Sequence, residues 1–258
     1  MAHGGKRMNE PVIIKLGGSI VTKKSEDGIV DFAGIRRLAE QIAPFVGNFP
    51  LIIVHGAGSC GHPEAKAYAI PGGVTKENAK GIFVTHEAVS KLNRSVITTF
   101  RETGIEAVSM PPLGSCLAEN GRLVSAGISQ IKEMLNLGIV PVLYGDVVMD
   151  TKRGACIISG DQIVPYFAVK LGAKRVGFAT DVGGVLSNGK IISEITRKNV
   201  TNINLGGSQN TDITGGMRGK INELLLLADE GINSHIFAAN RMADFLSERD
   251  YGGTMVKK

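Results

Sequence analysis

The stretch LIIVHGAGSCGHP, residues 51–63, decides how the rest of this sequence is interpreted. Its first four residues are apolar and mostly β-branched, which is typical of a strand buried on both faces of a parallel sheet. The three glycines that follow, Gly56, Gly58 and Gly61, let backbone N–H groups approach an anion closely. Pro63 suits the first turn of a helix, whose N-terminus favours negative charge. The stretch predicts a phosphate or carboxylate site at the end of a parallel strand.

Two other glycine-rich turns repeat this pattern. VIIKLGG, residues 12–18, is an apolar strand that runs into two glycines, with Lys15 just before the turn. TGGMRGK, residues 214–220, opens an apolar helix and carries Lys220 on its first turns. Three such turns and two lysines could converge on a polyphosphate.

The order of the elements predicts an α/β fold. A strand at 12–16, a helix at about 31–45 with Asp31 as its N-cap, and the strand at 51–55 form a unit that builds parallel sheets. Further strands are expected at 107–110, 140–143, 175–179, 234–238 and 254–256, with hairpins near 120, within 144–158 and near 188. Helices are expected over 64–101 with a break at 70–75, and at 128–137, 159–173 and 217–230. The polar segment 204–216 is expected to be a loop.

Composition excludes several classes of protein. The chain has 258 residues and a formal net charge of +5, and its basic residues form no stripe, so nucleic acid is not an expected partner. It has no apolar run near the roughly 20 residues that span a bilayer. Residues 1–10 lack the apolar core of a signal peptide and are interpreted as an extension of the domain. The three cysteines have no metal-ligand spacing and indicate reduced thiols in a cytoplasmic protein.

The segment GAGSCG, residues 56–61, also matches the GxGxxG pattern of nicotinamide-dependent oxidoreductases. That pattern requires a second strand ending in an acidic residue about 20 residues later. Glu77 lies near that distance but follows IPGGVTK, which is not strand-like. A P-loop is absent from the sequence. The oxidoreductase remains an alternative that the spacing disfavours.

Phosphoryl transfer accounts for more of the sequence. Its transition state spreads negative charge over the transferring oxygens, and catalysis consists mostly of positioning and cationic stabilisation. Lys15 and Lys220 could bracket the moving group, and Asp161, at the start of a helix, could hold both lysines. A single lysine is ordinarily solvated and a single helix-start aspartate is ordinarily a cap. The three together favour a kinase.

The chain resembles the amino acid kinase superfamily, and within it the isopentenyl phosphate kinases, from about residue 11 to the C-terminus. Six motifs carry the resemblance, in the order IIKLGGSIVTKK, VHGAGSCGHP, VPVLYGDVV, ISGDQIV, ATDVGGV and TDITGGMRGK. The resemblance implies a three-layer αβα sandwich with a mostly parallel central sheet. It also implies one domain at 11–258, with a phosphoryl-acceptor lobe at 11–171 and a nucleotide lobe at 172–258. The implied reaction is ATP- and Mg²⁺-dependent conversion of isopentenyl phosphate to isopentenyl diphosphate, in an alternative mevalonate route, by a homodimer.

The resemblance also implies roles for the matched residues. Those expected to contact the ATP phosphates are Lys15, Gly17, Gly18 and Ser19, with Gly58 nearby. Those expected along the nucleotide are Asp181, Gly215 and Lys220. Those expected to hold the acceptor phosphate are Ala57, His62 and Gly160. Lys24 would stabilise the transition state, a role that Lys23 could take instead, and Asp161 would organise Lys15 and Lys220.

His62 is the residue that distinguishes between the possible classes of acceptor. An amino-acid acceptor needs groups that recognise its α-amino and α-carboxylate, whereas a phosphomonoester needs a hydrogen-bond donor, which imidazole supplies. The second pKa of such a phosphate is roughly 6, so no general base is required. His55, directly after the strand, is interpreted as structural. The apolar residues Phe83, Val84, Ala88, Leu92, Val96 and Phe100 are expected to form a helix face that is mostly core, with Phe83 as a candidate contact for an isoprenoid tail.

One departure from the family pattern is Gly183, where the family often has an acidic residue; it puts a nucleotide or metal contact at that position in doubt. Two further alternatives stay open. One is a superfamily kinase with another small acceptor, such as fosfomycin. The other is a non-catalytic nucleotide-binding protein, which would be expected to lose a catalytic lysine or Asp161, and this chain keeps them.

Overall fold

The central element of the fold is β1 (Val12–Leu16), a strand with all five residues buried. The computed structural model describes residues 10–23, 28–203 and 216–258. β1 pairs in parallel with β2 (Leu51–His55) on one side and with β9 (Arg175–Thr180) on the other. The full sheet has eight strands in the order β12-β14-β13-β9-β1-β2-β6-β3. Its remaining strands are β3 (Ala107–Ser109), β6 (Val140–Tyr144), β12 (Glu194–Ile195), β13 (Ser234–Ala238) and β14 (Thr254–Val256). Among these strands β13 and β14 are antiparallel and the other pairs are parallel.

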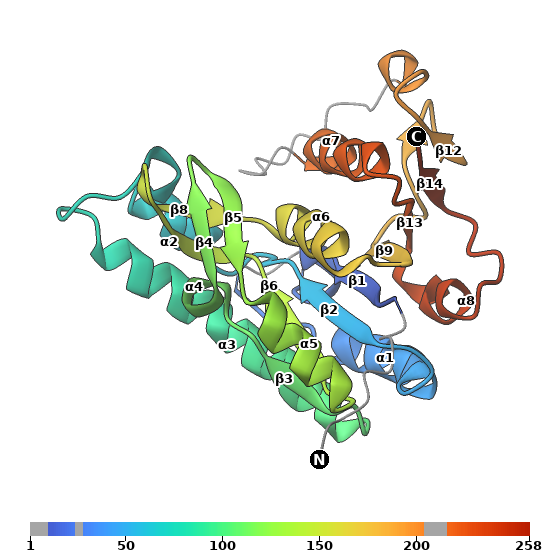
Figure 1. Cartoon of the computed structure of the whole chain (residues 1–258), viewed down its shortest axis with the longest axis horizontal. Coiled ribbons are helices and arrows are strands. Elements are labelled where there is room, and N and C mark those ends of the chain that lie inside the picture. Colours follow the sequence, from blue (N-terminus) through green and yellow to red (C-terminus); the bar gives the residue numbers. More distant parts are fainter. Residues whose placement is uncertain (1–9, 24–27, 204–215) are drawn as a thin grey trace.

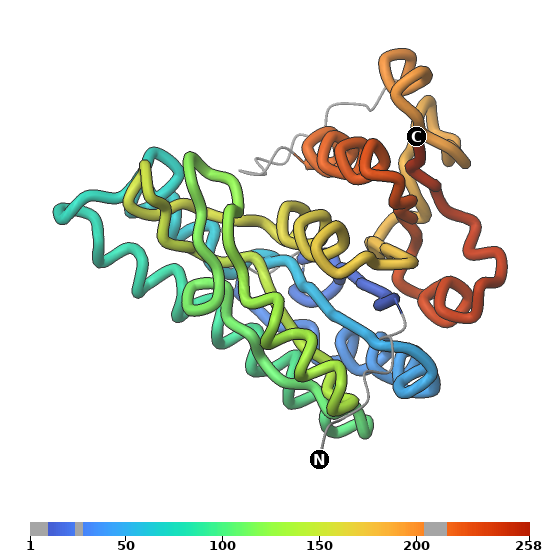
Figure 2. The backbone as a smooth tube through the Cα atoms, viewed as in Figure 1, coloured from blue at the N-terminus to red at the C-terminus, as the bar shows by residue number. Residues whose placement is uncertain are grey.

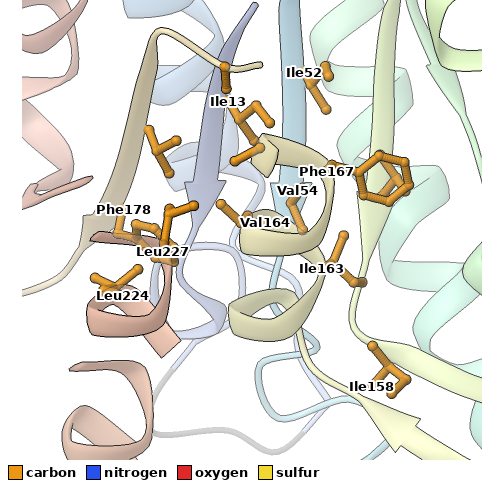
Figure 3. Packing of buried hydrophobic residues seen from close by; sticks show 14 of the residues in the cluster. Ile13, Ile52, Val54, Ile158, Ile163, Val164, Phe167, Phe178, Leu224 and Leu227 are labelled. Carbon is orange, nitrogen blue, oxygen red and sulfur yellow. The ribbon is translucent and has the colours of Figure 1, made fainter. Parts of the chain in front are cut away.

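Helices cover both faces of this sheet because alternate strand residues point to opposite sides. Ile14 and Ile53 pack in one cluster with α1 (Phe32–Ile42), α3 (Lys80–Glu102) and α8 (Met242–Leu246). Ile13 and Ile52 pack in the other with α5 (Ile128–Asn136), α6 (Gly160–Leu171) and α7 (Gly216–Asp229), as Figure 3 shows for α6 and α7. The predicted three-layer αβα sandwich with a mostly parallel sheet is confirmed (Figure 1).

A second sheet of four strands lies beside the sandwich, in the order β5-β4-β7-β8. It consists of two hairpins, β4 (Cys116–Glu119) with β5 (Arg122–Ala126) and β7 (Asp146–Asp150) with β8 (Gly154–Ile158). β4 pairs with β7 through Ala118 and Asp150. The short helix α4 (Pro112–Ser115) connects β3 of the large sheet to β4 of the second sheet, and the short helix α2 (His62–Ala67) follows β2. β10 (Leu186–Ser187) and β11 (Lys190–Ile191) form a separate small hairpin.

Most expected elements are present, and the N-cap is confirmed because the Asp31 carboxylate accepts from Gly34 N at 2.8 Å. The prediction that Phe83 belongs to a buried apolar face was wrong at the start of α3. Phe83 is 67% exposed, and the buried positions in that part of the helix include Thr85 and Val89. The reason lies at Gly81, where an added Cβ would lie 2.4 Å from Tyr68 Cβ. This close approach turns Gly81 inward and Phe83 outward.

The sheet is continuous across residue 171, because β1 bonds to strands on both sides of that position. Figure 2 shows the C-terminal part of the chain returning, so that α7 lies against α6. The division into an acceptor lobe and a nucleotide lobe stays a prediction. No helix within the described residues has both the length and the apolar character needed to cross a membrane.

Candidate active site

The turns after four neighbouring strands meet at one edge of the sheet. Gly17 N donates to Ala179 O at 2.9 Å, and Gly56 N donates to Leu16 O at 2.9 Å. Gly145, after β6, continues the row by donating to His55 O at 3.1 Å. The chain leaves β1 towards β2 on one side and later returns to β9 on the other. Ligands of open α/β sheets bind outside the carboxyl ends of the strands at such a point.

Two of these turns pack backbone against backbone. A Cβ on Gly18 would lie 2.5 Å from Gly58 N and Cα, and a Cβ on Gly56 would lie 2.7 Å from Gly18 N. Gly58 has a φ of +58°, in the left-handed region that favours glycine. Thr22 links the two turns, because its hydroxyl donates to Gly18 O at 3.1 Å and accepts from Ser59 N at 3.2 Å. The sequence analysis assigned Thr22 no role, because nothing in its local sequence relates it to the turn at Gly58.

A buried cluster of three charges lies next to these turns. Lys15, on β1, and Lys220, on α7, are 7% and 8% exposed. Lys15 Nζ lies 2.9 Å from Asp161 Oδ1, and Lys220 Nζ lies 2.8 Å from the same atom and 3.0 Å from Oδ2. Asp161 is on the first turn of α6, which Ser159 and Gln162 cap reciprocally. Three elements far apart in sequence thus place two ammonium groups on one carboxylate.

The charged groups in this cluster shift each other's pKa values. Burial alone raises the pKa of Asp161, but the adjacent charges and hydrogen bonds of Lys15 and Lys220 hold that pKa below its usual value. Burial and the charge of Lys15 lower the pKa of Lys220 from 10.5 to about 8, and Asp161 opposes the shift. The cluster therefore carries a net positive charge at neutral pH, next to backbone turns free of side chains. This arrangement suits anionic oxygens.

The residues predicted to hold an acceptor phosphate lie on the neighbouring turns. A Cβ on Gly160 would lie 3.2 Å from Lys15 Cε. A Cβ on Gly145 would lie 3.6 Å from Gly160 N and 3.8 Å from Ala57 N, so these three backbone segments adjoin each other beside Lys15. His62 opens α2 after Gly61 and is partly exposed. Within the part of the chain that the structure describes, its ring forms no hydrogen bond.

The residues predicted along the nucleotide are only partly described. Ser19 Oγ donates to Asp181 Oδ1 at 3.0 Å, which joins the turn after β1 to the turn after β9. Gly183 faces β11, where an added Cβ would lie 2.8 Å from Ile191 Cδ1, so a larger side chain would require Ile191 to move. Lys24 and Gly215 lie outside the described residues.

A polar network along α3 was also missed by the sequence analysis. His86 Nδ1 donates to both oxygens of Asp146, at 2.9 and 3.1 Å, and Ser90 Oγ lies 3.2 Å from Nε2 of the same ring. The hydrogen bond to Asp146 raises the pKa of His86, whereas burial raises the pKa of Asp146. The two residues are 60 positions apart, and no motif relates them.

His55 and Cys60 lie close to the site but have structural rather than catalytic roles. His55 is fully buried, with Nδ1 2.9 Å from Gly56 O and Nε2 3.2 Å from Asn93 Oδ1, and burial lowers its pKa. It acts as a packing residue. Burial, followed by the charge of Glu64, raises the pKa of the Cys60 thiol. A protonated, buried thiol is a poor nucleophile.

Comparison with known proteins agrees with this geometry. The model of the Amino acid kinase family matches residues 10–238. A relative from Methanothermobacter thermautotrophicus, named isopentenyl phosphate kinase, is 42% identical over 242 residues, covering 88% of this chain and 91% of the relative. A relative of the same name from Haloferax volcanii is 38% identical, covering 93% and 96%. A solved isopentenyl phosphate kinase structure superposes with a TM-score of 0.83 at 35% identity, covering 96% of this chain and 100% of that chain. The chain belongs to the amino acid kinase family.

Proposed function

We propose that this chain is an ATP-dependent kinase that converts isopentenyl phosphate to isopentenyl diphosphate. The observation that carries phosphoryl transfer is the buried cluster of Lys15, Asp161 and Lys220 at the sheet edge. The choice of acceptor is supported by His62 and by the relatives named isopentenyl phosphate kinase, which match over most of their own length.

Each group has a role in the proposed reaction. Lys15 and Lys220 neutralise charge that develops on the transferring oxygens, and Asp161 holds both ammonium groups. The turn formed by Gly17 and Gly18, with the Ser19 hydroxyl and the nearby Gly58, contacts the ATP phosphates. Asp181 and Gly215 lie along the nucleotide, and Lys24, or Lys23 beside it, stabilises the transition state.

The acceptor needs no general base. Ala57, His62 and Gly160 hold its phosphate, whose second pKa of roughly 6 leaves it dianionic near neutral pH. One of its oxygens forms a bond to the γ-phosphorus while the bond from that phosphorus to the bridging oxygen of ADP breaks. No proton is transferred in this step, so His62 orients the acceptor and donates a hydrogen bond. Phe83, exposed on α3, is the proposed contact for the isoprenoid tail.

Mg²⁺ is proposed to enter with the nucleotide. Among residues 10–23, 28–203 and 216–258, no group of three His, Cys, Asp or Glu side chains could hold a metal ion. Mg²⁺ keeps several waters and binds mainly through substrate phosphates with one or two carboxylates. Asp181 is the carboxylate at the nucleotide side of the site and would be the protein ligand or its water-bridged partner. A homodimer, a cytoplasmic location and a place in a mevalonate route also remain predictions.

The test is ADP release from ATP and Mg²⁺ with a panel of acceptors: isopentenyl, dimethylallyl and geranyl phosphates, fosfomycin, acetylglutamate and uridine monophosphate. We expect a strong preference for isopentenyl phosphate, and loss of turnover in Lys220→Met. If only fosfomycin or an amino acid is phosphorylated, the chain is still a kinase, but the proposed role of His62 is refuted. Nucleotide binding without turnover of any acceptor would favour the non-catalytic alternative.

A further inference from the structure

The turn of the β4–β5 hairpin is bonded to both helices that carry the charged cluster. Arg122, the first residue of β5, forms a two-bond fork with Glu223 of α7: Nη1 donates to Oε1, and Nη2 donates to Oε2 at 3.0 Å. The side chain of Gln162, on the first turn of α6, donates to Gly121 O at 3.3 Å and accepts from Ser159 N at 3.3 Å. In Figure 1, α6 lies between this hairpin and α7.

The hairpin turn is itself held in place. The Asp150 carboxylate accepts from Asn120 N at 3.0 Å and from Gly121 N at 2.7 Å. It also accepts from Lys152 N at 2.8 Å and Arg153 N at 2.9 Å, in the turn between β7 and β8. One buried carboxylate thus joins the two hairpin turns. Arg122 therefore extends from a fixed support rather than from a free loop.

Glu223 transmits this support to Lys220. The two residues are three apart in α7 and lie on the same side of the helix. On the outer side of their contact, α6 and α7 border a groove of about 320 Å³, whose lining residues include Arg122, Glu223, Tyr166 and Leu226. Packing alone therefore leaves this side of α7 partly unsupported. The Glu223 side chain is 15% exposed and that of Arg122 is 54% exposed. The two-bond geometry and the burial of the carboxylate make the pair stronger than a solvated single-bond pair.

We propose that Arg122 is a positioning residue for phosphoryl transfer: its fork to Glu223 holds the first turns of α7 so that Lys220 stays against Asp161. The inference rests on the proposed function for its kinetic consequence only. Arg122 reaches from the part of the chain before residue 171 to the part after it. It acts through Glu223 and touches no atom of the charged cluster.

The chain offers a matched control. Arg197 binds Asp229 at the other end of α7 through Nη2–Oδ2 at 2.6 Å and Nε–Oδ1 at 3.4 Å. This pair joins two segments that both follow residue 171, and its side chains are 51% and 45% exposed, so its loss should cost no more stability than loss of the Arg122 pair and should not move Lys220. The variants are Arg122→Gln, Arg122→Lys, Arg197→Gln and the exchange of Arg122→Glu with Glu223→Arg. If Arg122→Gln fails to fold, Arg122→Lys, which retains one hydrogen bond, provides the test.

Two readouts separate positioning from stability. We expect kcat to fall by roughly tenfold or more in Arg122→Gln, with KM for the acceptor little changed, because small misplacement of a catalytic group is costly. Arg197→Gln should match the wild type, and the charge exchange should recover most of kcat. Equal kcat in Arg122→Gln and Arg197→Gln, or no recovery in the exchange, would overturn the proposal.

The second readout needs no activity. In ¹⁵N-lysine NMR of the ligand-free protein at pH 6, hydrogen exchange of the Lys220 ammonium, assigned with Lys220→Arg, should be slow in the wild type and Arg197→Gln and fast in Arg122→Gln. Slow exchange in all three would refute the positioning role even if the acceptor assignment failed. Fast exchange in Arg122→Gln alone would support that role independently of the reaction.

Discussion

Lys220 is the residue whose chemistry depends most on its surroundings. It is buried on α7 between Asp161 and the ring of Phe178, whose centroid lies 5.4 Å from Nζ. Burial and the charge of Lys15 lower its pKa to about 8, so the ammonium group loses its proton at a pH at which enzyme activity can still be measured. A transition state rich in negative oxygen needs the protonated form. The charge of Lys220 should therefore limit the reaction on the alkaline side.

This limit can be measured as the pH dependence of kcat/KM for ATP. The active form exists below the pKa of Lys220, so kcat/KM should fall as pH rises through about 8. Bound phosphates favour the protonated form, so the corresponding fall in kcat should occur at higher pH. In Lys220→Arg the guanidinium stays charged, and any remaining activity should lack this alkaline fall. An identical fall in both proteins would assign it to another group.

His62 should act as a hydrogen-bond donor. Replacing His62 with Ala should reduce kcat/KM for the acceptor by roughly 10²-fold, the loss typical of a donor that stabilises developing charge. His62→Gln retains an N–H donor and should recover part of the activity. Steady-state kinetics at saturating ATP will measure both variants. Wild-type kinetics in His62→Ala would remove the residue from the site.

At the scale of elements, the site depends on how closely two turns approach each other. Gly18 and Gly58 touch through their backbones, and this contact keeps the N–H groups of both turns at one place. The sequence could predict each turn, because a strand followed by glycines is a local pattern. It could not predict their contact, which follows from the parallel pairing of β1 with β2.

Gly18→Ala should therefore weaken nucleotide binding. The new Cβ would lie 2.5 Å from Gly58 N and Cα, which are backbone atoms that cannot rotate away. We expect ATP affinity, measured by calorimetry, to fall by roughly tenfold or more, together with a loss of thermal stability. Gly114→Ala is the control, since nothing lies within 4 Å of the Cβ there. Equal ATP affinity in the two variants would contradict the close approach of the turns.

Helix register shows where prediction from local pattern fails. The N-cap of α1 and the helix start at Ser159 follow from side chains within a few residues, and both were predicted. The orientation of α3 depends instead on the contact of Gly81 with Tyr68, so Phe83 points outward. The pairing of β4 with β7 through Ala118 and Asp150 likewise joins hairpins that no local pattern connects.

At the scale of the whole molecule, one sheet joins the two parts of the chain at the site. Lys15 and Asp161 come from the first part and Lys220 from the second, and their cluster forms only when β1 lies between β2 and β9. The glycine-rich turns and the two lysines predicted this convergence, and the six ordered motifs predicted the family. They did not predict the contacts of Thr22 and Asp146, although both residues lie within quoted motifs, because their partners are distant in sequence. Arg122 and His86 lie outside the six motifs.

Acid stability tests the packing of the C-terminal strands. Burial and the charge of Arg175 lower the pKa of His235 from 6.5 to about 4. The unfolded chain takes up this proton before the folded chain does, so stability present above pH 6.5 should be lost as pH falls toward 4. The free energy of unfolding, from urea titrations at pH 7 and pH 4.5, should decline less in His235→Phe. Equal declines would assign the acid sensitivity to other groups.

The central claim is that the chain transfers the γ-phosphate of ATP to the phosphate of isopentenyl phosphate. The most direct measurement is ³¹P NMR of the protein with ATP, Mg²⁺ and isopentenyl phosphate. We predict that the phosphomonoester resonance disappears while two mutually coupled diphosphate doublets grow, in equal amount with ADP. A phosphomonoester resonance that persists, whether or not ADP accumulates, would contradict the account.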